Sequence, residues 1–176
     1  MRELADSERI RRFISALGAE AQEEGRAYLT GGATAVLLGW RPTTIDVDIV
    51  FEPESDPLLR AVARLKDDLR VNVELVSPTD FIPLPAGWRD RSLFVTRDGR
   101  LSFFHFDPYS QALAKVERAH AQDLDDVRSF LAARLVEPDL ALRMFEEIES
   151  QLYRFPAIDP GSFRATAERV FGPAAG

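Results

Sequence analysis

The sequence contains no cysteine, and this absence excludes three structural or chemical features at once. Without a thiol the chain has no disulfide framework, no thiolate zinc site and no cysteine nucleophile. Long apolar runs are also missing, since no segment approaches the roughly 20 apolar residues that a membrane-spanning helix needs. The N-terminus has no basic region followed by an apolar stretch, so we expect a cytoplasmic protein with no membrane partner.

An excess of positive charge is missing too, because the formal net charge is −7. This balance argues against a broad electrostatic grip on nucleic acid and leaves room only for a local basic patch. Four arginines lie in and around a predicted hairpin, at Arg89, Arg91, Arg97 and Arg100. They form either such a patch for an RNA acceptor or a solvated rim. His105 and His120 are the two histidines, and neither lies at a metal-ligand spacing.

The rest of the composition is that of an ordinary globular α/β domain. Of 176 residues 45% are hydrophobic and 29% are charged, which argues against disorder. Apolar periodicity predicts helices over 7–24, 33–38, 57–69, 108–120, 123–134, from 138 onward and over 163–171. Strands are predicted over 26–30, 45–51, 71–76, 91–97 and 100–106, with Asp98-Gly99 as a hairpin turn. We expect one domain over 1–135 and a helical extension over 136–176 packed on it.

Two acids alternate with apolar residues in the predicted strand over 45–51. Asp46 and Asp48 are separated by Val47 and flanked by Ile45 and Ile49. Because side chains in a strand have a period of two, both carboxylates point to one face, roughly 7 Å apart, and their apolar neighbours point into a core. Mg²⁺ prefers oxygen ligands and commonly uses one or two carboxylates together with substrate phosphates. The pair therefore predicts a metal-dependent phosphate site.

Two further features extend this prediction. Gly31-Gly32 ends an apolar segment, and such a turn lets backbone N–H groups approach a phosphate closely. Glu74 is an acid on the next strand, where it would complete a cage of three carboxylates around one or two metal ions. The alternative is that both strands simply have solvated acidic faces. Arg41 is either a phosphate clamp or an ion-pair partner of Asp46 or Glu52.

These residues resemble the signature of the polymerase-β-type nucleotidyltransferases. The resemblance rests on Gly31-Gly32, then Arg41 with Thr43 or Thr44, then Asp46-Val-Asp48. Downstream, the run Lys115, Arg118, Asp123 and Asp126 is similar to the helical motif of the small AbiEii-type nucleotidyltransferase-like proteins. The two motifs cover roughly residues 28 to 131. The resemblance implies a minimal nucleotidyltransferase fold, a mixed sheet of about five strands flanked by helices.

The same resemblance implies a role for each matching residue. Gly31 and Gly32 would face the triphosphate, Asp46, Asp48 and Glu74 would bind Mg²⁺, and Lys115 would contact phosphate. The expected nucleotide contacts also include Thr34, Arg41, Thr44, Asp123 and Asp126. Many active members have serine where this chain has Gly32, so a hydroxyl contact to phosphate is expected from Thr30 or Thr34. From the sequence alone, Asp123 is equally well explained as a helix N-cap.

The function that follows is transfer of a nucleotidyl group from a nucleoside triphosphate to an acceptor hydroxyl, with release of pyrophosphate. The cofactor is Mg²⁺, with Mn²⁺ as a substitute, and the candidate acceptors are tRNA or a protein. The resemblance also implies a toxin–antitoxin setting with a cognate protein partner. Two alternatives stay open. One is an inactive nucleotide-binding or partner-binding module, and the other is a transferase for an aminoglycoside-like polycation, which an acidic surface would suit.

Overall fold

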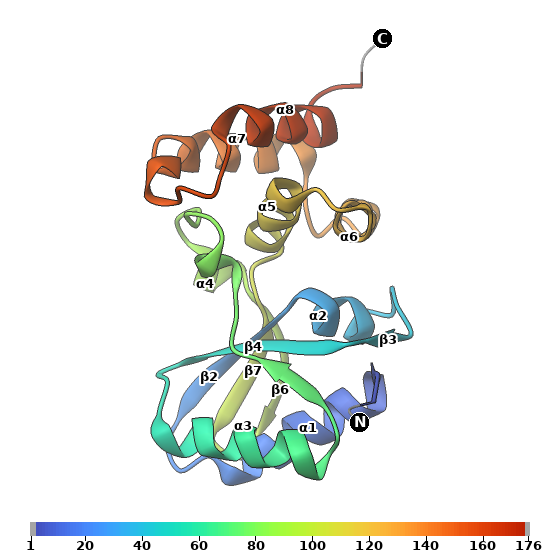
Figure 1. The fold of residues 1–176 in the computed structure, drawn as a ribbon, viewed down its shortest axis with the longest axis vertical. Coiled ribbons are helices and arrows are strands. Elements are labelled where there is room, and N and C mark those ends of the chain that lie inside the picture. The colour runs from blue at the N-terminus through green and yellow to red at the C-terminus, as the bar shows by residue number, and fades with distance from the viewer. Residues whose placement is uncertain (1–2, 175–176) are drawn as a thin grey trace. The chain divides into compact units, whose positions relative to one another are not determined.

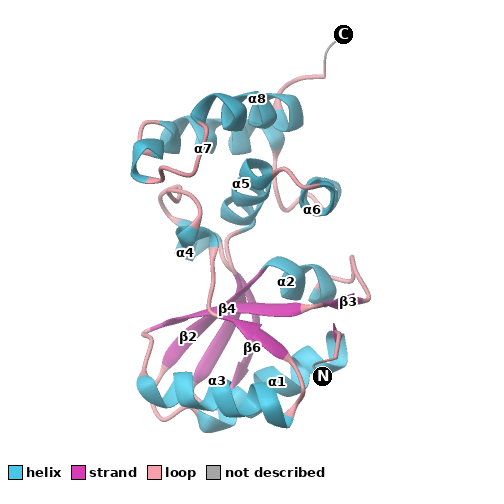
Figure 2. Cartoon of the chain, viewed as in Figure 1, coloured by secondary structure: helices cyan, strands magenta, loops and turns pink. Residues whose placement is uncertain are grey.

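The computed structural model describes residues 3–174, in which helices and strands alternate along the chain (Figures 1 and 2). The strands are β1 (Ala5–Asp6), β2 (Gly25–Thr30), β3 (Thr43–Thr44), β4 (Asp46–Glu52), β5 (Asn72–Glu74), β6 (Leu93–Asp98) and β7 (Leu101–His105). The α-helices are α1 (Ser7–Glu20), α2 (Gly31–Leu37), α3 (Asp56–Asp68), α4 (Trp88–Arg91), α5 (Pro108–Arg118), α6 (Ala121–Ala132), α7 (Pro138–Glu149) and α8 (Pro160–Phe171).

The chain forms two compact units, each with its own buried core. The first comprises residues 3–77 and 92–106, and the second comprises residues 78–91 and 107–174. The boundary expected after residue 135 stays a prediction. The predicted fold class is confirmed, because the described residues form a mixed α/β structure with a five-stranded mixed sheet and helices at the C-terminal end.

The first unit is built on the five-stranded sheet, whose strand order is β5-β4-β2-β7-β6. β2 pairs with β4 antiparallel and with β7 parallel, β4 pairs with β5 parallel, and β6 pairs with β7 antiparallel. The predicted hairpin is confirmed between β6 and β7, but its turn is Gly99-Arg100, one position later than predicted, because Asp98 still pairs with Leu101. β1 and β3 form a separate two-stranded antiparallel pairing next to the start of β4.

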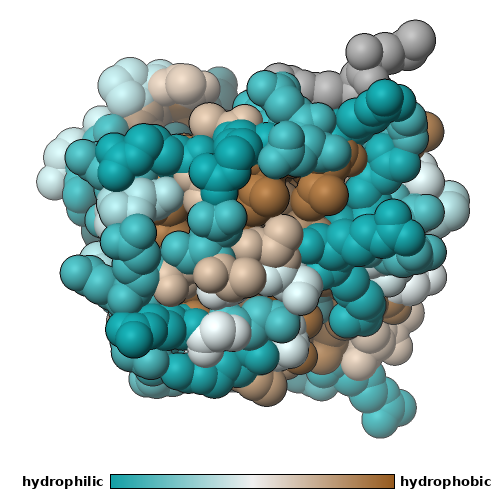
Figure 3. Space-filling model, turned by 90° about the horizontal axis from the view of Figure 1, so that it is seen from below, coloured by the Kyte–Doolittle hydropathy of each residue, from teal (hydrophilic) through white to brown (hydrophobic). Residues whose placement is uncertain are grey.

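Helices α1 and α3 cover one face of this sheet. Their apolar stripes include Phe13, Leu17 and Val62, which pack into one cluster with the inward residues of the central strands, such as Ile49 and Phe103. Asp6 caps α1, since its carboxylate accepts a hydrogen bond from the backbone N–H of Arg9 at 2.8 Å. Seen from below, where α1 and α3 lie in Figure 1, the surface is mostly hydrophilic (Figure 3). These helices therefore bury one side and expose the other.

The ends of several elements differ from the sequence-based bounds. The first helix ends at Glu20 rather than at residue 24, because the residues from Gln22 to Glu24 have no apolar side chain to bury. Ile45 was expected in the core, but it is 69% exposed because β4 begins only at Asp46. The strand that carries Glu74 ends at that residue, which leaves Leu75 43% exposed.

The second unit is helical. Its core is formed by residues of α5 to α8, and the rings of Phe145 and Phe163 meet edge to face with centroids 4.8 Å apart. α5 begins at Pro108 as predicted, and Asp107 is its N-cap. No helix in residues 3–174 combines the length and the apolar character required to pass through a bilayer.

Candidate functional site

The acids of β4 lie on one side of the sheet, as the sequence predicts. Val47, Ile49 and Phe51 are 0%, 0% and 6% exposed, whereas Asp46 and Asp48 are half-buried on the opposite face. This alternation follows from the period of two in an extended strand. The apolar side chains therefore fix the register that turns both carboxylates away from the core.

The parallel pairing of β4 with β5 brings a third carboxylate to the same face. In the register, Asp46 lies opposite Asn72, and Asp48 lies opposite Glu74. Side chains opposite one another on neighbouring strands share a face, at a strand spacing of about 4.8 Å. Glu74 is exposed. We call Asp46, Asp48 and Glu74 the acidic face.

Asn72 belongs to this face and was not singled out as a site residue from the sequence. Its Nδ2 donates a hydrogen bond to Oδ1 of Asp46. The signal for it was present, because Asn72 is two residues from Glu74 in a predicted strand and therefore shares its side. What the sequence lacked was the parallel register that sets Asn72 opposite Asp46.

The glycine turn before α2 approaches the acidic face closely. Gly31 has φ +59°, and a Cβ placed on it would lie 2.5 Å from Oδ2 of Asp48. Both the left-handed backbone and the lack of space require glycine at this position. Thr30, the last residue of β2, is opposite Asp48 in the antiparallel register. The structure therefore brings Gly31 and Asp48 together, as the predicted site requires.

Gly32 is explained by a different neighbour. A Cβ on Gly32 would lie 2.0 Å from Oγ1 and 2.7 Å from Cβ of Thr44. Thr44 is 9% exposed, and its hydroxyl donates a hydrogen bond to the carbonyl oxygen of Asp46 at 3.0 Å. The space that a serine at position 32 would need is therefore occupied by Thr44, which gives a steric reason for glycine here.

Thr34 lies in the interior of the first unit. It is 1% exposed, and its hydroxyl donates to the carbonyl oxygen of Leu29 at 3.2 Å. The Thr34 Oγ1 is also 3.0 Å from Nδ1 of His105. Because the Thr34 hydroxyl donates its proton to Leu29, it can only accept from His105. We therefore infer that Nδ1 of His105 carries a proton and donates it to Oγ1 of Thr34. His105 is therefore buried and hydrogen-bonded inside the first unit.

Burial changes the acid–base behaviour of His105. The side chain is 6% exposed, and desolvation, with a smaller contribution from the positive charge of Arg11, lowers the pKa of His105 from 6.5 to about 4. The imidazole is therefore neutral in the folded protein near neutral pH.

Arg41 is half-buried in the segment between α2 and β3. This segment also contains Gly39, which has φ +81° and ends the helix as the sequence predicts. Arg41 therefore lies close in the chain to both the glycine turn and the acids, and its role toward a phosphate stays a prediction.

The acidic face offers only part of a metal coordination shell. Within residues 3–174, no three or more His, Cys, Asp or Glu side chains are grouped closely enough to hold a metal ion by themselves. Two neighbouring aspartates with oxygen donors are nevertheless a fitting donor set for Mg²⁺, which commonly takes one or two carboxylates and completes its shell with phosphate oxygens and water. The donor set fits a metal ion that arrives with a nucleotide better than one held by protein alone.

The residues of the helical motif converge in the second unit. Nζ of Lys115 donates to Oδ2 of Asp126 at 2.6 Å and lies 3.6 Å from Oδ1 of Asp123. Arg118 binds both oxygens of Asp123, through Nε at 3.2 Å and a terminal nitrogen at 3.1 Å. Asp123 and Asp126 are only 4% and 3% exposed. The explanation of Asp123 as an N-cap is wrong, because α6 begins at Ala121 and His120 occupies the cap position.

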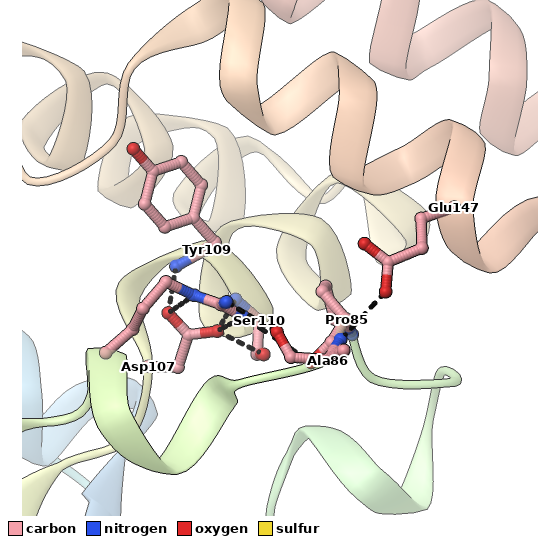
Figure 4. Close-up of polar contacts among 7 residues, drawn as sticks. Pro85, Ala86, Asp107, Tyr109, Ser110 and Glu147 are labelled. Carbon is pink, nitrogen blue, oxygen red and sulfur yellow. Dashed lines mark hydrogen bonds and ion pairs between the residues drawn. The ribbon is translucent and has the colours of Figure 1, made fainter.

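A buried carboxylate organises the same unit. Asp107 is 0% exposed, and it accepts hydrogen bonds from Nε of Arg91 at 3.1 Å and from a terminal nitrogen of Arg91 at 2.8 Å (Figure 4). It also accepts from the backbone N–H groups of Tyr109 and Ser110 and from the Ser110 hydroxyl. Arg91 in turn donates to the carbonyl oxygen of Ala86 at 2.6 Å. The pair therefore ties the loop before α4 to the start of α5.

The four arginines around the hairpin are divided between the two units. Arg89 and Arg91 belong to the second unit, and Arg97 and Arg100 belong to the first. Each is engaged locally, since Arg91 pairs with Asp107, Arg97 with Glu24, Arg100 with the carbonyl oxygen of Gln22, and Arg89 stacks over Trp88. These contacts favour the solvated rim over the basic patch.

Comparison with known families agrees with the motifs of the first unit. The model of the family described as "Nucleotidyltransferase of unknown function (DUF6036)" matches residues 8–157, which is most of the chain. No curated protein and no solved structure is significantly similar to this sequence. The match spans both the acidic face and the helical motif. The chain therefore belongs to the DUF6036 family of nucleotidyltransferases of unknown function.

Proposed function

We propose that this protein transfers a nucleotidyl group from a nucleoside triphosphate to an acceptor hydroxyl in a reaction that depends on Mg²⁺, with Mn²⁺ as a substitute. The observation that carries the proposal is the register in which Asp48, two positions after Asp46, lies opposite Glu74, with Gly31 against the Asp48 carboxylate. Membership of a nucleotidyltransferase family supports it.

In this proposal Asp46 and Asp48 hold the metal ion, and Glu74 lies beside them. The bound ion would offset the negative charge of the triphosphate and of the departing pyrophosphate. Asp46 and Asp48 contribute oxygen donors from one strand, so their spacing is fixed by the backbone. Gly31 and Gly32 bring the backbone of the turn close to Asp48 and Thr44, and a phosphate bound at the acids would approach that backbone. Arg41, in the segment between the glycine turn and the acids, would contact a phosphate oxygen.

The chemical step needs a base for the acceptor hydroxyl. The acceptor oxygen forms a bond to the α-phosphorus, the bond from that phosphorus to the bridging oxygen breaks, and pyrophosphate leaves. The hydroxyl proton passes to a carboxylate oxygen of Glu74, which is exposed and opposite Asp48. The Thr44 hydroxyl restrains the backbone of the site through its hydrogen bond to the Asp46 carbonyl oxygen.

We further propose that this protein is of the AbiEii type. It would then act in the cytoplasm as one member of a toxin–antitoxin pair, with a cognate protein partner. The convergence of Lys115, Asp123 and Asp126 in one network supports this assignment, because these are the positions that match the helical motif. In the proposal Lys115 contacts a phosphate, and Asp123 and Asp126 hold its ammonium group in place and take part in nucleotide binding. The candidate acceptors are tRNA and a protein hydroxyl.

A second candidate keeps nucleotide or partner binding and lacks the transfer step. It is favoured by the finding that no three acids within residues 3–174 form a complete metal-binding group. This candidate predicts nucleotide binding that depends on Mg²⁺ without consumption of the triphosphate.

The decisive experiment incubates the protein with each labelled nucleoside triphosphate, Mg²⁺ and total tRNA. We expect label to move to the acceptor and pyrophosphate to be released with the wild type and not with Asp48→Asn. Asp68→Asn is the matched control, because Asp68 is an exposed acid at the end of α3 in the same unit. Equal transfer by the wild type and Asp48→Asn would exclude the proposed site. Binding measured by calorimetry with no transfer to tRNA or to protein would favour the second candidate.

A further inference from the structure

Asn72 occupies a position that the proposed reaction leaves unassigned. It is the only asparagine among the 176 residues, and it begins β5, a strand of three residues at one edge of the sheet. In the parallel register it lies directly opposite Asp46, one of the two aspartates proposed to hold the metal ion.

The hydrogen bond of Asn72 selects one oxygen of that aspartate. Nδ2 donates to Oδ1 of Asp46, so this oxygen is engaged by an amide and Oδ2 is the oxygen left for a cation. A side-chain amide is neutral, so it restrains the carboxylate without cancelling the charge that attracts the metal ion. A lysine at this position would neutralise Asp46, and an aspartate would repel it.

The same bond ties the edge strand to its neighbour. β5 pairs with β4 over only three residues, from Asn72 to Glu74, and Glu74 is exposed. Val71 and Val73 anchor this segment in the core, at 0% and 3% exposed. The bond from Asn72 to Asp46 adds a link between the two strands on the outward face. Asn72 therefore restrains both Asp46 and the strand that carries Glu74.

We infer that Asn72 is a positioning residue of the acidic face, which orients the Asp46 carboxylate for metal binding and holds Glu74 opposite Asp48. The inference rests on the proposed function, because it assigns to Asn72 a role in the same site. Residues that orient a metal ligand typically change metal affinity by about 10- to 100-fold when they are removed. Removal of the Asn72 amide is therefore expected to weaken metal binding without removing any ligand.

The first test uses the fact that the sequence has a single asparagine. Protein labelled with ¹⁵N only at asparagine shows one side-chain amide pair by NMR, and that pair reports Asn72 directly. We expect its chemical shifts to change on Asp46→Ala and to stay unchanged on the control Asp68→Ala. Addition of Mn²⁺ with a nucleoside triphosphate should broaden the pair through paramagnetic relaxation. An amide pair that does not respond to Asp46→Ala would overturn the inference.

The second test measures Mn²⁺ affinity by calorimetry in the presence of a non-hydrolysable nucleoside triphosphate. We expect Asn72→Ala to raise the dissociation constant at least about tenfold, and Asn72→Gln, which keeps an amide donor, to recover part of the loss. The thermal unfolding midpoint of each variant shows whether it is folded. If the wild type binds no Mn²⁺, the proposed function is wrong even where the NMR pair reports the bond to Asp46. If the wild type and Asn72→Ala bind Mn²⁺ equally, only the positioning role is wrong.

Discussion

The two units of this protein use carboxylates in opposite ways. In the first unit, Asp46, Asp48 and Glu74 lie half-buried or exposed on one sheet face, where like charges are neighbours. In the second unit, Asp107, Asp123 and Asp126 are 0%, 4% and 3% exposed, and each is paired with an arginine or a lysine. The same functional group is therefore accessible and crowded by acids in one unit, and inaccessible and neutralised in the other.

This difference separates acids that are open to a ligand from acids whose charge is compensated within the protein. A buried carboxylate is costly unless a cation and several hydrogen bonds compensate for its lost hydration, and removal of the cation alone is then strongly destabilising. A cluster of acids on a surface lowers stability slightly through repulsion, and such clusters are kept where they serve a function. The two sets of acids should therefore respond differently to substitution.

The largest effect is expected at the ion pair between the half-buried Arg91 and the buried Asp107. Arg91→Met removes the cation and both of its hydrogen bonds from a carboxylate that is 0% exposed. We expect a loss of about 3–5 kcal/mol in the free energy of unfolding, the range found when one partner of a buried pair is removed. Urea denaturation followed by circular dichroism measures this loss.

The control for this prediction is an exposed ion pair of the same unit. Arg128 pairs with Asp125 on the surface of α6, and both side chains are 70% exposed. Arg128→Met is expected to change the free energy of unfolding by less than about 0.5 kcal/mol. Equal losses for the two variants would contradict the assignment of Asp107 as the organising acid of the second unit.

The second-largest effect is the dependence of stability on pH that His105 introduces into the first unit. Its pKa is about 4 in the folded protein and 6.5 in the unfolded chain, so the unfolded state binds a proton first as the pH falls. Stability is therefore complete above about pH 6.5 and decreases as the pH falls toward 4. The total loss is about 3 kcal/mol.

This dependence is measured by denaturant unfolding of the wild type and His105→Gln between pH 7.5 and about pH 4. The glutamine keeps a hydrogen-bond donor for Thr34 and does not titrate, so its stability should fall less steeply with decreasing pH. His120→Gln is the control, because the His120 side chain is 77% exposed. If the stability of the wild type and of His105→Gln falls in parallel with decreasing pH, His105 is not the source of the pH dependence.

A smaller effect is expected where the glycine turn meets the acidic face. Gly32→Ala places a Cβ 2.0 Å from Oγ1 of the buried Thr44, and overpacking of this kind costs about 1–3 kcal/mol. Thr44→Ala removes that closest atom. In a double-mutant cycle, the cost of Gly32→Ala should therefore be lower in the Thr44→Ala background than in the wild type. Additive costs would show that the two residues are not in contact.

Local sequence patterns predicted the elements that carry these residues. The alternation over residues 45–51 predicted that Asp46 and Asp48 share a face, and the helix predicted over 108–120 begins at Pro108 as expected. Each of these two features depends only on residues a few positions apart, so each can be predicted from the sequence. The exposure of Ile45 was missed because the start of β4 depends on its pairing partners.

Contacts between distant residues were not predictable in the same way. Arg91 is 16 residues from Asp107, and Asn72 is 26 residues from Asp46. The close approach of Thr44 to Gly32, which leaves no room for a Cβ, depends on how α2 packs beside β3. Parallel pairing needs a crossover, so neither register nor partner follows from the sequence of one strand. The sequence therefore indicated which residue types form the acidic face and could not show what holds each of them.

The smallest effect is expected at the acidic face itself. Asp48→Asn keeps the size of the side chain and removes one of three neighbouring negative charges, so the repulsion that it relieves offsets the polar contacts that it weakens. We expect the free energy of unfolding to change by less than about 0.5 kcal/mol, while Mn²⁺ binding in the presence of a nucleoside triphosphate is lost. Because a purely structural acid would show the reverse, with binding retained and stability reduced, the ratio of the two effects identifies which kind of acid Asp48 is. A loss of several kcal/mol at Asp48, close to that of Arg91→Met, would remove the distinction between the two units.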